Sequence, residues 1–261
     1  MSLRRGGEEG VEISVVVPVL NSRSTLVELE ERITAALVAA DLGTFEVVFV
    51  DDGSTDGSVE LLARLADGRE STSTIALPAN VGQAGALVAG LLAVTGAVVV
   101  TLDDDLGQRP EDIPLLVAAV HDGAPVAYGR IPRRDENPLR RSASWAIRAM
   151  LGLVMGHAMG QAVSPFRAFD ARLVADLTDA DRSCASIDLL LARGTDRFVV
   201  VPVGRGAGAE GAASRYTVAG LLALAGRMAS MAVRMGRRGQ TTRPAPRPTA
   251  ALEPAPPVRA R

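Results

Sequence analysis

The stretch Val98-Val-Val-Thr-Leu-Asp-Asp-Asp-Leu-Gly-Gln-Arg-Pro110 decides the fold, because an apolar run in it ends at three consecutive acids. The β-branched run Val98–Leu102 is typical of a buried strand in a parallel sheet. The three acids follow where that strand leaves the sheet, at the edge where open α/β sheets bind ligands. Buried carboxylates are costly unless they are paired, so the cluster indicates a site for a divalent cation. The alternative is a solvated turn before a helix that begins near Glu111.

Strand and helix patterns alternate through the first half of the chain. The expected strands are 13–19, 45–50, 74–77, 97–102 and 125–128, and the expected helices are 25–40, 58–66, 83–94 and 110–120. This order predicts an α/β fold with a mostly parallel central sheet and helices on both faces. The second half is less regular. An apolar helix is expected at 142–155, and short strands are expected at 166–169 and 198–203.

Composition narrows the class of protein. The 261 residues are 48% hydrophobic and carry a net charge of −2, which favours one sizeable domain and no nucleic-acid partner. Every basic residue is arginine, so phosphate binding falls to guanidinium groups. The single cysteine, Cys184, excludes an internal disulfide framework and favours a reducing compartment. With no signal-peptide pattern and no uninterrupted membrane-spanning run, the predicted location is cytoplasmic.

Four segments are expected along the chain. They are a disordered N-terminal tail at 1–10, one globular domain at 11–215, an amphipathic helical segment at 216–238, and a disordered tail rich in proline, arginine and alanine at 239–261. Arginines interleave with apolar residues between 221 and 238. That pattern favours either peripheral contact with the inner face of the cytoplasmic membrane or an ordinary packing helix. The sequence indicates no oligomeric state.

Several motifs, taken in order, resemble those of family 2 glycosyltransferases, which have the GT-A fold. They are Val15–Asn21, Val48–Asp56, Asn80–Gln83, Asp103–Asp105, Pro110–Pro114, Tyr128–Arg130 and Ser164–Phe169. The resemblance is strongest to the branch that loads a sugar onto a polyprenyl phosphate, including dolichyl-phosphate mannose synthases and undecaprenyl-phosphate aminoarabinose transferases. It implies an inverting, metal-dependent enzyme with a nucleotide-sugar donor (a UDP-sugar rather than a GDP-sugar) and an undecaprenyl-type phosphate acceptor.

The acids and the first loops supply the expected donor site. Hard cations prefer oxygen ligands, so Asp103 and Asp105 are the candidate ligands for Mg²⁺ or Mn²⁺, with Asp104 facing the other way. Such an ion neutralises the charge that develops on a diphosphate leaving group. By resemblance, the nucleotide-binding residues are Pro18, Leu20, Ser22, Val50, Asp52, Asp104 and Arg215. From its own motif, Asp52 is equally a turn-former within Asp-Gly-Ser.

The expected acceptor needs no general base, because a phosphate monoester is already ionised near neutral pH. By resemblance, Arg130, Arg140 and Ser144 hold the acceptor phosphate, although the arginine-rich stretch could equally be a solvated basic loop. The motif Gln-x-x-Arg-Trp of the processive family members is absent. The alternative enzyme is a soluble transferase acting on a glycan or small-molecule hydroxyl, with its base supplied by Asp135, Glu136 or Asp170.

Two departures from the family pattern favour a third hypothesis, a degenerate GT-A domain that does not catalyse transfer. The family usually reads Asp-x-Asp-Leu-Gln, and Gly107 stands at the glutamine position. Gln108 follows at once and is the expected replacement ligand, unless water fills the place. Near the end of the motif region, an arginine that usually reaches the diphosphate is missing unless Arg205 reaches in.

Overall fold

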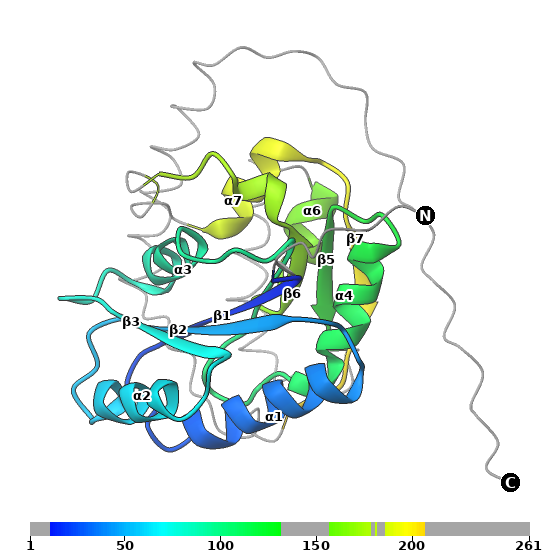
Figure 1. Cartoon of the computed structure of the whole chain (residues 1–261). Helices are drawn as coiled ribbons and strands as arrows, with labels where there is room; N and C mark the ends of the chain where they lie inside the picture. Colours follow the sequence, from blue (N-terminus) through cyan, green and yellow to red (C-terminus); the bar gives the residue numbers. More distant parts are fainter. Residues whose placement is uncertain (1–10, 132–156, 179–180, 182–185, 207–261) are drawn as a thin grey trace, which may run out of the picture.

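The chain forms a seven-stranded sheet with the order β3-β2-β1-β4-β6-β5-β7 (Figure 1). The computed structural model describes residues 11–131, 157–178, 181 and 186–206. The strands are β1 Ile13–Val19, β2 Phe45–Asp51, β3 Thr72–Ala76, β4 Val98–Thr101, β5 Val126–Arg130, β6 Arg167–Asp170 and β7 Val199–Pro202. Strand β6 is antiparallel to both of its neighbours, and the other strand pairs are parallel. The expected mostly parallel sheet is therefore confirmed.

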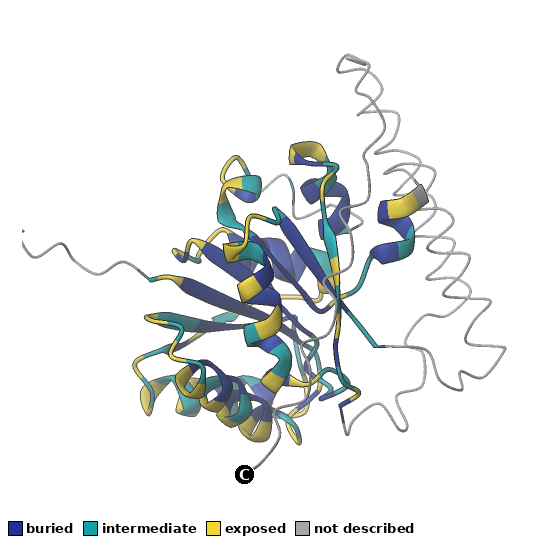
Figure 2. Ribbon diagram, turned by 90° about the vertical axis from the view of Figure 1, so that its right-hand side faces the viewer, coloured by how far each residue is buried: buried dark blue, intermediate teal, exposed yellow. Residues whose placement is uncertain are grey.

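Helices cover both faces of the sheet, as expected. They are α1 Leu26–Ala39, α2 Ser58–Asp67, α3 Gln83–Leu91, α4 Ile113–His121, α6 His157–Ala162 and α7 Ile187–Gly194, with short 3₁₀ turns η1 Pro110–Asp112 and η2 Ala171–Val174. One apolar cluster joins α1, α2 and α4 to one face, and a second joins α3, α6 and α7 to the other. Figure 2 shows the buried positions concentrated in the strands between these layers.

The central strands have no polar face because both of their faces are covered. In β1, Val15 and Val17 pack on the side of α1, whereas Val16 packs on the side of α3. All seven residues of β1 are buried. This double burial explains why the strands read as continuous apolar runs instead of alternating patterns.

The expected elements of the first half are confirmed with small shifts at their ends. The segment expected as one helix at 110–120 is instead η1 followed by α4. Helices α6 and α7 were not expected from the sequence. The expected tails and the segments 142–155 and 216–238 lie outside the described residues. No helix in the described part of the chain is both long enough and apolar enough to span a membrane.

Close packing of α3 on the sheet requires a glycine at position 90. A Cβ atom there would lie 2.5 Å from Cγ1 of Val16 and 3.0 Å from Cγ2 of Val50. We expect Gly90→Ala to lower the free energy of unfolding by about 1–3 kcal/mol, because core overpacking forces strain or displacement. Urea denaturation measures the change. The matched control is Gly68→Ala, where the nearest atom would be 3.6 Å away. Equal effects of the two substitutions would contradict this account of α3 packing.

Candidate active site

The polar loops of the domain emerge at one edge of the sheet. Strands β1, β2, β3 and β4 run in the same direction, and β5 shares it because β6 is antiparallel to both β4 and β5. The carboxyl ends of these five strands therefore meet at one edge, together with the amino end of β6. The expected site residues on the loops after β1, β2 and β4, and Arg130 at the end of β5, lie along this edge.

Asp104 fastens the loop after β1. The residue is 3% exposed, and its Oδ2 accepts hydrogen bonds from the Leu20 backbone N–H at 3.0 Å and from the Ser22 hydroxyl at 2.5 Å. The Thr25 hydroxyl donates to the main-chain oxygen of Asp104 at 2.6 Å, just before α1 begins. The middle acid of the cluster is thus directed toward the loop that contains two of the expected nucleotide-binding residues.

Asp52 fastens the loop between β3 and α3. It is 2% exposed, and its two oxygens accept from the backbone N–H groups of Val81 at 2.7 Å and Gly82 at 2.9 Å. Burial raises the pKa of Asp52, while the two backbone hydrogen bonds oppose that rise. The turn itself is made by Asp51, whose Oδ2 accepts from the N–H groups of residues 53 and 54. The interpretation of Asp52 as the turn-former is therefore wrong.

Asp103 is directed toward the side of the sheet that carries α3. Gln83, the first residue of α3, donates to its Oδ1 at 2.5 Å. The Gln108 amide donates to its Oδ2 at 2.9 Å and accepts from the Asp103 N–H, also at 2.9 Å. Burial raises the pKa of Asp103, with Asp105 and Asp104 adding to the rise and Gln108 opposing it.

Asp105 has a carboxylate oxygen that no donor among the described residues reaches. Its Oδ1 accepts from the Gly107 N–H at 2.8 Å, and among the described residues no donor reaches Oδ2. No group of three or more histidine, cysteine or acidic side chains in the described part of the chain could hold a metal ion. Mg²⁺ that binds together with a nucleotide commonly uses one or two carboxylates, with phosphate and water as its other ligands. Asp103 and Asp105 fit that kind of site.

The segment after β7 packs directly on the acid loop. The Gly206 N–H donates to the Gly107 carbonyl at 3.1 Å, and the Gly204 N–H donates to Asp112 Oδ2 at 2.7 Å. A Cβ atom at position 206 would lie 2.1 Å from the Leu106 carbonyl oxygen. A glycine is therefore required where this segment crosses the loop. Arg205, between the two glycines, is exposed.

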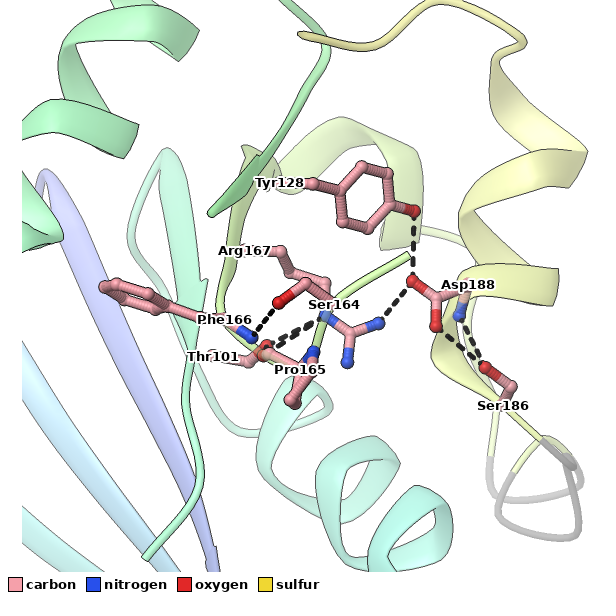
Figure 3. Close-up of polar contacts among 8 residues, drawn as sticks. All are labelled: Thr101, Tyr128, Ser164, Pro165, Phe166, Arg167, Ser186 and Asp188. Carbon is pink, nitrogen blue, oxygen red and sulfur yellow. Dashed lines mark hydrogen bonds and ion pairs between the residues drawn. The ribbon is translucent and has the colours of Figure 1, made fainter. Parts of the chain in front are cut away.

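A buried ion pair lies beside the end of β4, and its pairing was not predicted from the sequence (Figure 3). Arg167 of β6 donates to Asp188 of α7, and Asp188 also accepts from the Tyr128 hydroxyl at 3.0 Å. Burial raises the pKa of Tyr128 well above its ordinary value, and the Asp188 charge adds to that rise. The only signal in the sequence was an arginine inside a short apolar strand, where a charge needs a partner.

The other expected residues fall into two groups. Pro18 and Val50 are buried and paired across β1 and β2, so the Val50 side chain belongs to the core. Arg130 is half-buried at the carboxyl end of β5. Three expected contacts lie outside the described residues, as do two of the candidate bases. They are Arg140, Ser144 and Arg215, and Asp135 and Glu136.

Asp170 does not fit the role of a base. It pairs with Val98 at the amino end of β4, whereas the acid cluster follows the carboxyl end of that strand. Its carboxylate is bonded to the side chain of Arg172, and this contact holds the pKa of Asp170 below its ordinary value. The expectation that Asp170 could act as the general base is therefore wrong.

Comparison with known proteins identifies relatives of this chain. The model of "Glycosyl transferase family 2" matches residues 14–178. An undecaprenyl-phosphate 4-deoxy-4-formamido-L-arabinose transferase from Klebsiella pneumoniae subsp. pneumoniae is 34% identical over 194 residues, covering 74% of this chain and 59% of that protein. The transferase of the same name from Salmonella enteritidis PT4 has the same identity and coverage. The chain thus spans about 59% of the length of these relatives.

Solved structures resemble the fold more broadly. Glucosyl-3-phosphoglycerate synthase from Mycobacterium tuberculosis, crystallised with Mn²⁺, uridine diphosphate and phosphoglyceric acid, superimposes with a TM-score of 0.63 and 21% sequence identity. The likeness covers 91% of this chain and 86% of that one. It confirms the expected GT-A architecture of the domain.

The crossing of Gly206 over the acid loop is testable with a pair of glycine substitutions. We expect Gly206→Ala to lower the free energy of unfolding by about 1–3 kcal/mol, because its methyl group would meet rigid backbone. Gly204→Ala is the matched control, since the atoms nearest to its methyl group belong to the flexible Arg109 side chain. Chemical denaturation of both variants measures the difference. A Gly206→Ala protein as stable as the control would show that the segment does not pack on the loop.

Proposed function

The chain belongs to glycosyl transferase family 2, and we propose that it moves a sugar from a UDP-sugar to a polyprenyl phosphate with inversion at the sugar carbon. The observation that carries the proposal is the division of the acid cluster. Asp104 is fastened to the loop after β1, whereas Asp103 and Asp105 remain at the edge of the sheet with oxygens suited to an ion. The names of the curated relatives support an undecaprenyl-phosphate acceptor.

The donor nucleotide would lie on the loops that the buried acids hold. Asp104 fixes Leu20 and Ser22, which follow Pro18, and Asp52 fixes the loop before α3. Loops held by such hydrogen bonds are pre-organised, so ligand binding does not carry the entropy cost of ordering them. Val50 would contribute through its backbone, and Arg215 would reach the diphosphate.

The proposed metal is Mg²⁺ or Mn²⁺, held by Asp103 and Asp105, with Gln108 as the predicted third protein ligand. When bound, such an ion stabilises the negative charge that a diphosphate leaving group gains in the transition state. The Gln108 oxygen is bonded to the Asp103 N–H, so direct ligation requires exchange of that bond. The Mn²⁺ and uridine diphosphate in the mycobacterial synthase support the ion and the donor base.

The acceptor would approach past the ends of β4, β6 and β5. Arg130 lies two strands from the end of β4, about 10 Å away. Together with Arg140 and Ser144, it would position the acceptor phosphate for attack on the sugar, and no side chain needs to remove a proton. The place of Asp170 at the opposite edge supports this choice over a hydroxyl acceptor. Because the acceptor is a lipid, we propose that the enzyme works at the inner face of the cytoplasmic membrane.

Donor binding is testable by calorimetric titration of UDP, and of GDP for comparison, with and without Mn²⁺. We expect UDP to bind in a Mn²⁺-dependent way. We expect Asp105→Asn to weaken that binding about tenfold or more, because it removes one charged ligand. Asp67→Asn, at the exposed end of α2, is the matched control. Failure of the wild-type chain to bind either nucleotide would favour the degenerate domain. Mn²⁺-dependent binding of GDP alone would correct the donor base.

Acceptor binding is testable through Arg130. We expect Arg130→Met to raise the KM for undecaprenyl phosphate about tenfold or more, since a lost charged hydrogen bond is worth about 1.5–3 kcal/mol. UDP affinity should stay unchanged. Transfer of radiolabelled sugar from UDP-sugars to the lipid measures the effect. Arg197→Met serves as the control, because this exposed arginine precedes β7 at the other edge of the sheet. A fall in UDP affinity instead would place Arg130 at the donor.

A further inference from the structure

Arg167 is a buried cation held by several protein contacts. Its side chain is 6% exposed and that of Asp188 is 4% exposed. The Arg167 Nε donates to the Thr101 hydroxyl at 3.1 Å, and its Nη1 donates to Asp188 Oδ1 at 2.5 Å (Figure 3). Bonds at two separate nitrogens fix the plane of the guanidinium group, which has little freedom to turn.

Asp188 is itself fixed by neighbours on two elements. Its Oδ1 accepts from the Tyr128 hydroxyl of β5, and its Oδ2 accepts from the Ser186 hydroxyl at 2.9 Å. The carboxylate thus joins β5, β6 and the start of α7. Its charge balances that of Arg167, as a buried cation requires.

Among the described residues, no acceptor is bonded to one nitrogen of the Arg167 guanidinium group. In Figure 3 the second terminal nitrogen, Nη2, has no hydrogen bond to the residues drawn. Among the described residues, the one fully buried side-chain polar atom that lacks a partner is Oδ1 of Asp51. Nη2 is not a second such atom, so it is not completely buried, although the Arg167 side chain as a whole is only 6% exposed.

The register of the strands places this nitrogen on the face that carries the proposed donor site. Arg167 pairs with Thr101 across β6 and β4, and Asp103 follows two residues after Thr101. Thr101 and Arg167 project to the same face as Val99 and Phe169, which pack on the side of α3. Asp103 lies just past the end of β4, and its carboxylate accepts from Gln83 at the start of α3. The positive charge of Arg167 also opposes the rise in the pKa of Asp103, which agrees with their closeness.

We propose that Arg167 is a donor-binding residue, whose Nη2 donates a hydrogen bond to the β-phosphate of the nucleotide, and that Asp188 is the positioning residue that aims it. This inference rests on the proposed function. A planar guanidinium with one open N–H matches a phosphate oxygen, and bonds to phosphate are stronger than bonds to a neutral hydroxyl. If Arg167 only linked β6 to α7 as a structural brace, it would not need a nitrogen that is available to a ligand.

The test compares UDP with UMP, which lacks the β-phosphate, in the presence of Mn²⁺. We expect Arg167→Lys to weaken UDP binding about tenfold or more and UMP binding by less than about twofold. A lysine ammonium group cannot donate to Thr101, Asp188 and a phosphate oxygen in the geometry of the planar guanidinium group. Binding of UMP also reports that the nucleotide loops are intact. The matched control is Arg193→Lys on α7, an arginine paired with Asp181 near the surface.

A separate titration of Mn²⁺ alone, followed by electron paramagnetic resonance, distinguishes direct contact from an effect through the metal. We expect Arg167→Lys to leave Mn²⁺ affinity unchanged. Equal losses for UDP and UMP, or a loss of UDP affinity that follows a loss of Mn²⁺ affinity, would overturn the proposal. If the wild-type chain binds neither UDP nor GDP, the proposed function fails and this inference fails with it.

If Arg167→Lys does not fold, a second variant, Asp188→Asn, tests the role of Arg167. Asp188→Asn keeps the volume and an acceptor oxygen for Arg167 and Tyr128; it removes the balancing charge and turns the oxygen that accepts from Ser186 into an amide donor. The uncompensated guanidinium should then increase the preference for UDP over UMP severalfold. A simple brace predicts no such increase. An unchanged or smaller preference would overturn the assignment of Arg167.

Discussion

The carboxylate of Asp104 holds the edge of the domain together. It is buried, so it must be compensated by hydrogen bonds, and its donors come from the loop after β1. Its main-chain oxygen accepts from Thr25 at the entrance to α1. Asp52 acts in the same way on the loop before α3. The loops on which the proposed donor site depends are therefore fixed by buried acids, which cannot be lost without leaving backbone donors unpaired.

The three consecutive acids consequently have different structural roles. The buried Asp104 carboxylate is compensated by protein hydrogen bonds, so its burial does not require a bound ion. Asp103 is shared between two glutamine amides, which are neutral donors that an ion can replace without leaving a buried charge behind. Asp105 keeps one oxygen that no donor in the described part of the chain reaches. A run of like charges that would be repulsive as a cluster becomes stable because its members are directed to different neighbours.

Much of this arrangement was predictable from local patterns. The strands and the first helices follow from apolar runs bounded by polar loops, and the common edge of Asp52, Asp103 and Arg130 follows from the parallel order. The pairing of Asp188 with Arg167 did not follow, because it joins residues 21 positions apart on elements with weak local patterns. Helix α7 was missed for the same reason. Its Asp188 looks like an ordinary acidic residue near a helix start until the sheet brings β5 and β6 against it.

The same long-range packing gives the departure at Gly107 a structural context. A Cβ atom there would lie 2.8 Å from Asp105 Oδ1, and the Gly107 carbonyl accepts from Gly206. Gly107 and Gly206 thus belong to one tight crossing, in which a larger residue at either place would disturb the acid loop. The amide then comes from Gln108, one position later, where it bonds to Asp103 on two sides. The departure at Gly107 is therefore better explained as part of this packing, with an amide supplied one position later, than as a simple loss from the donor site.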